Sequence, residues 1–91
     1  MRNTSLAFVV AALVAGAATA EASSLGRACT TAPESQWLSL DALKAKIEGQ
    51  GYRVQKAKLK KGCGEVYARD PKGARTELFL DPSSGEIVAR E

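Results

Sequence analysis

The stretch D-P-K-G-A-R-T-E-L-F-L-D-P-S-S-G-E-I-V, from Asp70 to Val88, sets the fold because it places one alternating segment between two Asp-Pro turns. From Ala74 to Leu80 the side chains alternate between two faces at the period of two that a β-strand requires. One face carries Thr76, Leu78 and Leu80, and the other carries Glu77 and Phe79. A hairpin must bring like faces together, so the length of each turn can be tested against the pattern of the strands that it joins.

The first turn, Asp70 to Gly73, predicts a three-residue hairpin loop. With Gly73 in the left-handed region, Asp70 pairs with Ala74. This register places Val66 opposite Leu78, so that two apolar side chains meet on one face of the sheet.

The second turn is one residue longer and predicts a four-residue loop, Pro82 to Gly85. Asp81 then pairs with Glu86, and Leu80 lies opposite Ile87. One residue more or less in this loop would break the match between apolar faces. The Asp81 side chain is expected to accept a backbone N–H group of its own turn. The stretch is therefore interpreted as a device that sets strand register rather than as a chemical site.

Upstream of the turns, the sequence predicts one helix and further strands. Leu40 to Gln50 repeats apolar residues at spacings of three and four after a capping serine, Ser39, and ends at glycines. Strands are expected at 52–60, 64–69, 74–80 and 86–90, and the phase of the first indicates either a bulge or a strand that only partly faces the core. The predicted fold class is α+β, with one N-terminal helix packed on a three- to four-stranded antiparallel β-meander.

The first 20 residues are predicted to be a secretory signal peptide. Arg2 is followed by a 13-residue run without charge, from Leu6 to Ala18, and by an A-x-A cleavage pattern ending at Ala20; a second site ends at Ala22. The run is shorter than the ~20 residues that cross a bilayer as a helix. A periplasmic or secreted protein without a membrane span after cleavage is expected. The net charge of +2 on residues 21–91 implies no particular partner, and no nucleic-acid partner is expected.

The remaining chain divides into an extended leader, residues 21–36, and a domain, residues 37–91. Cys29 and Cys63 are the only cysteines. In an oxidising compartment they are expected to form a disulfide that tethers the leader, since a domain of this size builds only a small core. A reactive thiol pair is the alternative, but no histidine and no Cys-x-x-Cys spacing is present to lower a thiol pKa.

Several of these features together resemble the PepSY domain. They are a helix followed by Gly-Tyr-x-Val (Gly51 to Val54), then Glu-Val-Tyr-Ala (Glu65 to Ala68), then Asp-Pro-x-Ser-Gly-Glu-Ile (Asp81 to Ile87), with one cysteine before the helix and one opening the second strand. The resemblance implies a helix on a small antiparallel sheet, in the short exported form of the domain. It also implies relatives in bacterial envelope proteins and in metallopeptidase propeptides, where such domains are thought to inhibit or chaperone the enzyme.

The sequence offers little for catalysis or cofactor binding. It holds no histidine, so neither a Ser-His nor a Cys-His pair can be built, and Ser83 and Ser84 have no base beside them. No D-x-D-x-D-G run supplies the oxygen ligands of a calcium site. A non-enzymatic protein is expected, with no catalytic residue, no metal and no cofactor.

The predicted registers also place side chains on the sheet face that lies away from the helix. Tyr67 falls diagonal to Phe79, and Phe79 falls opposite Val88, within a charged rim. An apolar centre with such a rim is typical of a protein contact surface, and an envelope peptidase or sensor is the expected partner. Alternatively, the aromatic residues only stabilise the sheet or are covered by the leader. The candidate partner-binding residues are Glu65, Tyr67, Arg69, Glu77, Phe79 and Val88.

A lysine cluster on the first strand supports a different hypothesis, in which the protein binds an anionic ligand or polyanion. The alternative is an edge strand that lysine protects from pairing with other strands. Self-association through a sheet edge or the apolar face is a third hypothesis, and the oligomeric state is left open. The candidate anion-binding residues are Lys56, Lys58, Lys60 and Lys61.

Overall fold

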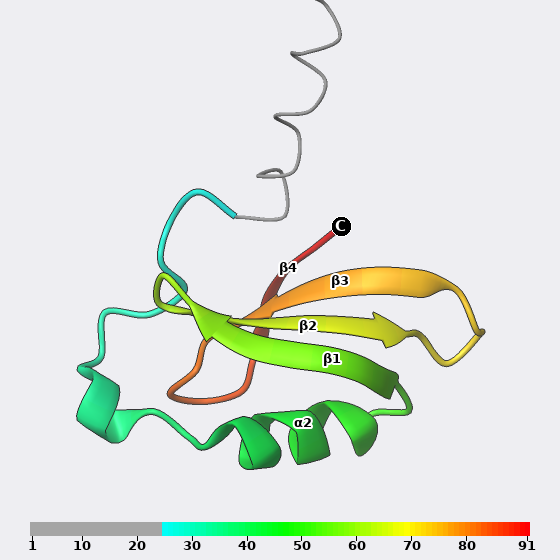
Figure 1. Cartoon of the computed structure of the whole chain (residues 1–91), viewed down its shortest axis with the longest axis horizontal. Helices are drawn as coiled ribbons and strands as arrows, with labels where there is room; N and C mark the ends of the chain where they lie inside the picture. Colours follow the sequence, from blue (N-terminus) through cyan, green and yellow to red (C-terminus); the bar gives the residue numbers. More distant parts are fainter. Residues whose placement is uncertain (1–24) are drawn as a thin grey trace, which may run out of the picture.

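The computed structural model describes residues 25–91, so the predicted signal peptide, its cleavage sites and the start of the leader lie outside the described residues (Figure 1). One α-helix packs on a four-stranded antiparallel sheet, which confirms the predicted α+β class. In chain order the elements are η2 Glu34–Gln36, α2 Leu40–Glu48, β1 Arg53–Lys60, β2 Cys63–Arg69, β3 Arg75–Leu80 and β4 Ile87–Arg90.

The helix α2 begins where the sequence predicts. The Ser39 side chain accepts a hydrogen bond of 3.1 Å from the backbone N–H of Ala42, which satisfies one of the free donors of the first turn. Leu43 and Ile47 are fully buried against the sheet. The helix ends at Glu48, two residues before the predicted end.

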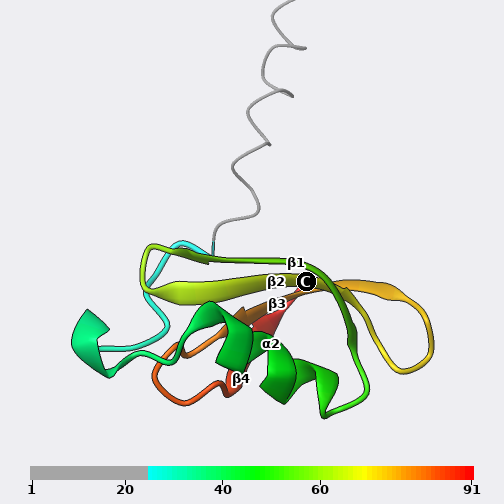
Figure 2. The same cartoon turned by 60° about the horizontal axis from the view of Figure 1, so that its bottom comes forward.

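The sheet is a meander in the order β1-β2-β3-β4, with α2 lying along one of its faces (Figure 2). Val66 pairs with Leu78 and Leu80 pairs with Ile87, as both turn lengths predict. In β1 the register shifts between Val54 and Lys56, which confirms that the strand carries a bulge.

The main core fills the space between α2 and the facing side of the sheet. Its fully buried members come from the helix and from the two central strands, and partly buried residues of β1, β4 and the helix start surround them. The side chains of this core are Leu43, Ile47, Val66, Ala68, Leu78 and Leu80.

The two Asp-Pro turns have the predicted lengths. Asp70 N–H donates to the Ala74 carbonyl (2.8 Å), and the Asp70 carboxylate accepts the N–H groups of Lys72 and Ala74 at 2.9 Å each. In the second turn, Asp81 N–H donates to the Glu86 carbonyl at 2.9 Å. The Asp81 carboxylate accepts the Ser83 N–H at 2.8 Å, so the prediction that Asp81 accepts a backbone N–H of its own turn is confirmed.

The second turn also joins parts of the chain that are distant in sequence. The Pro82 carbonyl accepts the Leu38 N–H at 2.8 Å, just before α2 begins. Gly85 has a φ of 84°, and a Cβ built there would lie 2.6 Å from the Cδ of Lys46. The turn thus fixes the start of the helix as well as the register of β4.

The register of β4 corrects one prediction. After the Leu80 and Ile87 pair, the register shifts, and Phe79 pairs with Ala89 instead of Val88. Val88 occupies this irregularity and is 38% exposed. The physical reason is a bulge, which adds one residue to β4 and moves every following residue by one position.

Candidate protein-binding surface

The sheet face away from α2, called here the outer face, is divided into a covered and an open half. The leader passes the end of the sheet that carries the β1–β2 turn before it reaches η2 and α2 (Figure 1). A disulfide joins Cys29 of the leader to Cys63 of β2, as predicted, and the Cys29 N–H donates to the Gly62 carbonyl at 3.1 Å. The disulfide thus holds the leader against this end of the outer face, which is called here the covered half.

Phe79 lies in the covered half. It is 0% exposed and forms a second small core with Cys29 and Cys63, against which Leu25 and Ala89 pack. The prediction that Phe79 presents an exposed contact is therefore wrong. The leader covers the ring, which is the alternative that the sequence left open.

Glu65 is also withdrawn from the surface. It pairs with Phe79 across β2 and β3 and is only 1% exposed. A buried glutamate cannot form part of a contact rim. The prediction that Glu65 contributes to a partner contact is therefore wrong, because Glu65, like Phe79, is buried.

The open half of the outer face centres on Tyr67, which is partly exposed. Lys56 pairs with Tyr67 from β1, and its ammonium nitrogen lies 6.0 Å from the centre of the ring. Glu77 pairs with Tyr67 from β3, so the ring stands between a cation and a carboxylate. The next row toward the Asp70 turn brings Arg69 opposite Arg75, and Arg69 Nη1 donates to the Gly73 carbonyl at 3.0 Å.

Glu77 is the member of this surface with a perturbed acidity. Desolvation by burial raises the pKa of the Glu77 carboxyl above its ordinary value, and the charges of Glu65 and Glu91 raise it further. The Tyr67 hydroxyl and Lys58 act in the opposite direction. Burial and the two neighbouring acids thus oppose the ionisation of Glu77.

Three of the four candidate anion-binding lysines share the outer face. Lys56, Lys58 and Lys60 pair in turn with Tyr67, Glu65 and Cys63. Lys61 lies in the β1–β2 turn with a φ of 51° and is exposed. The lysines do form a row, but a carboxylate lies opposite its middle member.

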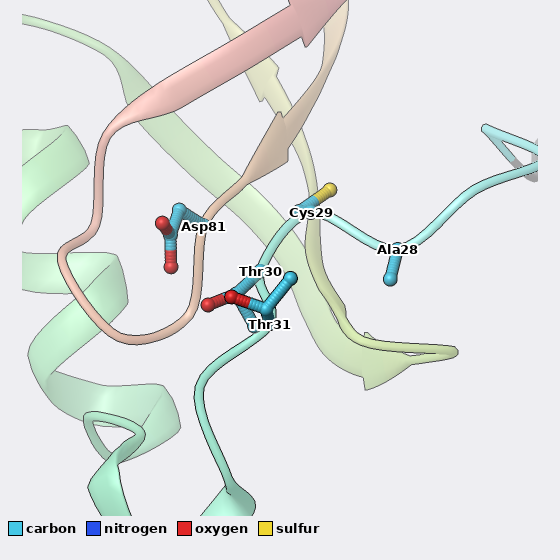
Figure 3. Close-up of a pocket in the computed structure, with 5 residues that line it drawn as sticks. All are labelled: Ala28, Cys29, Thr30, Thr31 and Asp81. Atoms are coloured by element: carbon cyan, nitrogen blue, oxygen red, sulfur yellow. The ribbon is translucent and has the colours of Figure 1, made fainter.

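A shallow hollow of about 390 Å³ lies where the leader passes the second Asp-Pro turn, lined by Ala28, Cys29, Thr30, Thr31 and Asp81 (Figure 3). The Asp81 carboxylate accepts the Ser83 N–H at 2.8 Å and the Ser83 hydroxyl at 2.7 Å. These bonds hold the pKa of Asp81 below its ordinary value, chiefly through the Ser83 hydroxyl. A carboxylate so stabilised is a weaker base than a free one, which fits a structural role of Asp81 in the turn.

Replacing Asp81 by alanine is expected to cost about 1 to 2 kcal/mol of unfolding free energy at neutral pH, because the turn loses a charged acceptor. The pKa of Asp81 is lowered in the folded protein, so its contribution is complete above the ordinary value of 3.8 and disappears as the pH falls through the folded value. Urea unfolding at several pH values should show a gap between wild type and Asp81→Ala that closes in acid. Asp81→Asn, which keeps an acceptor but cannot titrate, is the control, and a gap independent of pH would contradict the assignment.

The described residues also bear on metal binding and on membrane insertion. Within residues 25–91, no group of three or more histidine, cysteine or acidic side chains is placed to hold a metal ion. Over the same part of the chain, no helix has both the length and the apolar character needed to span a membrane.

Comparison with known proteins identifies the family. A protein-family model, described as the peptidase propeptide and YPEB domain, matches residues 6–91 of the chain. No curated protein and no solved structure gave a significant match. Domains of this family are generally non-catalytic and typically extracellular or periplasmic. Since the match covers nearly the whole chain, the protein belongs to the peptidase propeptide and YPEB (PepSY) domain family.

Proposed function

We propose that the protein is an exported, non-catalytic module that binds a peptidase of the cell envelope through the open half of its outer face. The supporting observation is that Tyr67 lies partly exposed between Lys56 and Glu77. Phe79, on the same face, is covered by the leader, so Tyr67 is the aromatic side chain of this face that a partner can reach. A ring flanked by charges has the composition of an interface centre, because tyrosine and arginine supply much of the binding energy of protein contacts.

A peptidase is the favoured class of partner because domains of this family often bind and regulate peptidases. The open half offers both signs of charge, with arginines at the Asp70 end and Glu77 beside the ring. Such a mixed surface favours a protein partner over a uniformly charged polymer.

The proposal predicts that Tyr67→Ala weakens binding to a purified envelope peptidase by at least about tenfold, since an interface tyrosine is commonly worth more than ~1.4 kcal/mol. The peptidase is first captured from an envelope extract, identified by mass spectrometry and purified, and its affinity is then measured by calorimetry. The variant Asp41→Ala, which changes an exposed residue of α2, should bind as wild type does. Equal affinity of folded Tyr67→Ala and wild type would refute the proposal.

The row formed by Lys56, Lys58 and Lys60 supports a second candidate function, the binding of an anionic polymer along β1. Such binding would weaken steeply with salt, because it depends on screened charges. Titration with heparin at two ionic strengths tests it. The absence of binding at low salt would remove this candidate.

A further inference from the structure

Two carboxylate oxygens on the outer face are buried without a hydrogen-bond partner among the described residues. They are Oε1 of Glu65 and Oε2 of Glu77. A buried acceptor that lacks a donor is costly, and a buried unpaired negative charge is more costly still. A group in this situation commonly lowers the cost by binding a proton.

The sheet register makes these two glutamates neighbours. Glu65 pairs with Phe79 and Tyr67 pairs with Glu77, so the two acids occupy diagonal positions on adjacent strands and on the same face. Side chains on such a diagonal start about 7 to 8 Å apart, which is within reach of two long side chains that turn toward each other. The charge of Glu65 also acts directly on the ionisation of Glu77.

Other charged groups face this pair from each neighbouring strand. From β1, Lys58 lies opposite Glu65 and Lys56 lies opposite Tyr67. Past β4, Glu91 exchanges both backbone hydrogen bonds with Glu77, at 2.9 and 2.8 Å, and adds negative charge.

On β2 itself, the Tyr67 hydroxyl favours the ionised form of Glu77. From the leader, the packing residues Leu25 and Cys29 are apolar and provide no compensating charge, while the nearby Arg27 is exposed. Lys58 and the Tyr67 hydroxyl thus favour the ionised form of Glu77, while one carboxylate oxygen of each acid has no donor among the described residues.

We propose that Glu65 and Glu77 share one proton, with the carboxyl O–H of one donating to the carboxylate of the other. The pair then carries a single negative charge. As the pH rises, the shared proton is released to water and the outer face gains one further negative charge beside Tyr67. The proton sharing itself does not depend on any partner. Its consequence, that the charge of the docking surface changes with pH, rests on the proposed function.

The test is a titration of the glutamate side-chain carboxyl carbons by ¹³C NMR on the full chain as isolated, from acid to alkaline pH. In wild type, Glu65 and Glu77 should show two-step curves that share both steps, because coupled groups titrate as a pair. In Glu65→Gln, the remaining Glu77 should titrate in one step at lower pH than the upper step in wild type. Glu86→Gln, which changes an exposed residue of the second turn, is the matched control and should leave both curves unchanged.

A single-step curve for Glu77 that is the same in wild type and in Glu65→Gln would overturn the proposal, because burial alone would then account for its acidity. The titration needs no partner, so this result is independent of whether Tyr67 binds a peptidase. If the pair titrates as expected but Tyr67→Ala binds normally, only the docking proposal fails.

Discussion

Replacing Phe79 by alanine is expected to lower the free energy of unfolding by about 3 to 5 kcal/mol, the cost of removing a large buried ring from a packed core. Phe79 is 0% exposed and joins the disulfide to β3. A domain of this size has only a few kcal/mol of net stability, so the variant should be largely unfolded at 37 °C. Urea unfolding followed by circular dichroism, at low temperature where the variant still folds, measures the difference.

The matched control is Tyr67→Ala, an aromatic residue on the same face but in the open half. It loses only partly exposed surface and should cost about 1 kcal/mol or less. If both variants lose the same stability, the division of the outer face into covered and open halves is wrong. This contrast also shows that Phe79 is unsuitable for testing binding, since its replacement would disrupt the fold.

Removal of the disulfide, as Cys29→Ala with Cys63→Ala, is expected to lower the melting temperature by more than about 10 °C. The bond joins residues 34 apart in sequence, and closing such a loop is worth roughly 3 to 4 kcal/mol on the chain-entropy model. Each kcal/mol shifts the midpoint of a small domain by about 4 to 8 °C. The leader is also released, so Phe79 loses part of its cover and the loss should be larger still.

Scanning calorimetry of wild type and the double variant gives the shift, and alkylation with mass measurement shows the state of the thiols. The single variants Cys29→Ala and Cys63→Ala should destabilise similarly, because either one opens the same loop. Two reactive thiols in freshly isolated native protein, or a shift below about 5 °C, would contradict a structural disulfide.

The sequence predicted the parts of the fold that depend on local geometry. Glycine positions and the alternation of apolar residues determine the length of each Asp-Pro turn, and both registers agree with the structure at Val66 and at Leu80. The helix start followed from Ser39, whose side chain forms the expected cap. These features depend on a few adjacent residues, so they can be derived from one sequence.

Features that depend on distant contacts were harder to predict. The bulge at Val88 leaves no signal in a strand as short as Ile87–Arg90, where one residue more or less preserves a plausible pattern. The burial of Phe79, in contrast, did leave a signal in the sequence. Cys63 has the same parity in β2 as Glu65 and Tyr67, so a disulfide to Cys29 must place the leader on the outer face.

The division of the candidate surface follows from that parity. The leader reaches the outer face at the Cys63 end, where it covers Phe79, while Tyr67 lies further along β2. Sequence alternation alone placed all these side chains on one face and could not say which of them the leader would cover. The acid pair was also missed, because alternation along the strand does not show that Glu65 is buried.

The central claim, that the open half around Tyr67 is the docking surface, is tested most directly by site-specific photo-crosslinking in the exporting cell. The photoreactive residue p-benzoylphenylalanine replaces Tyr67 in one variant and the exposed helix residue Asp41 in another. An adduct from position 67 that contains an envelope peptidase is expected, and no such adduct is expected from position 41. Adducts of equal yield from both positions, or none from position 67 in folded and exported protein, would show that the open half is not the docking surface.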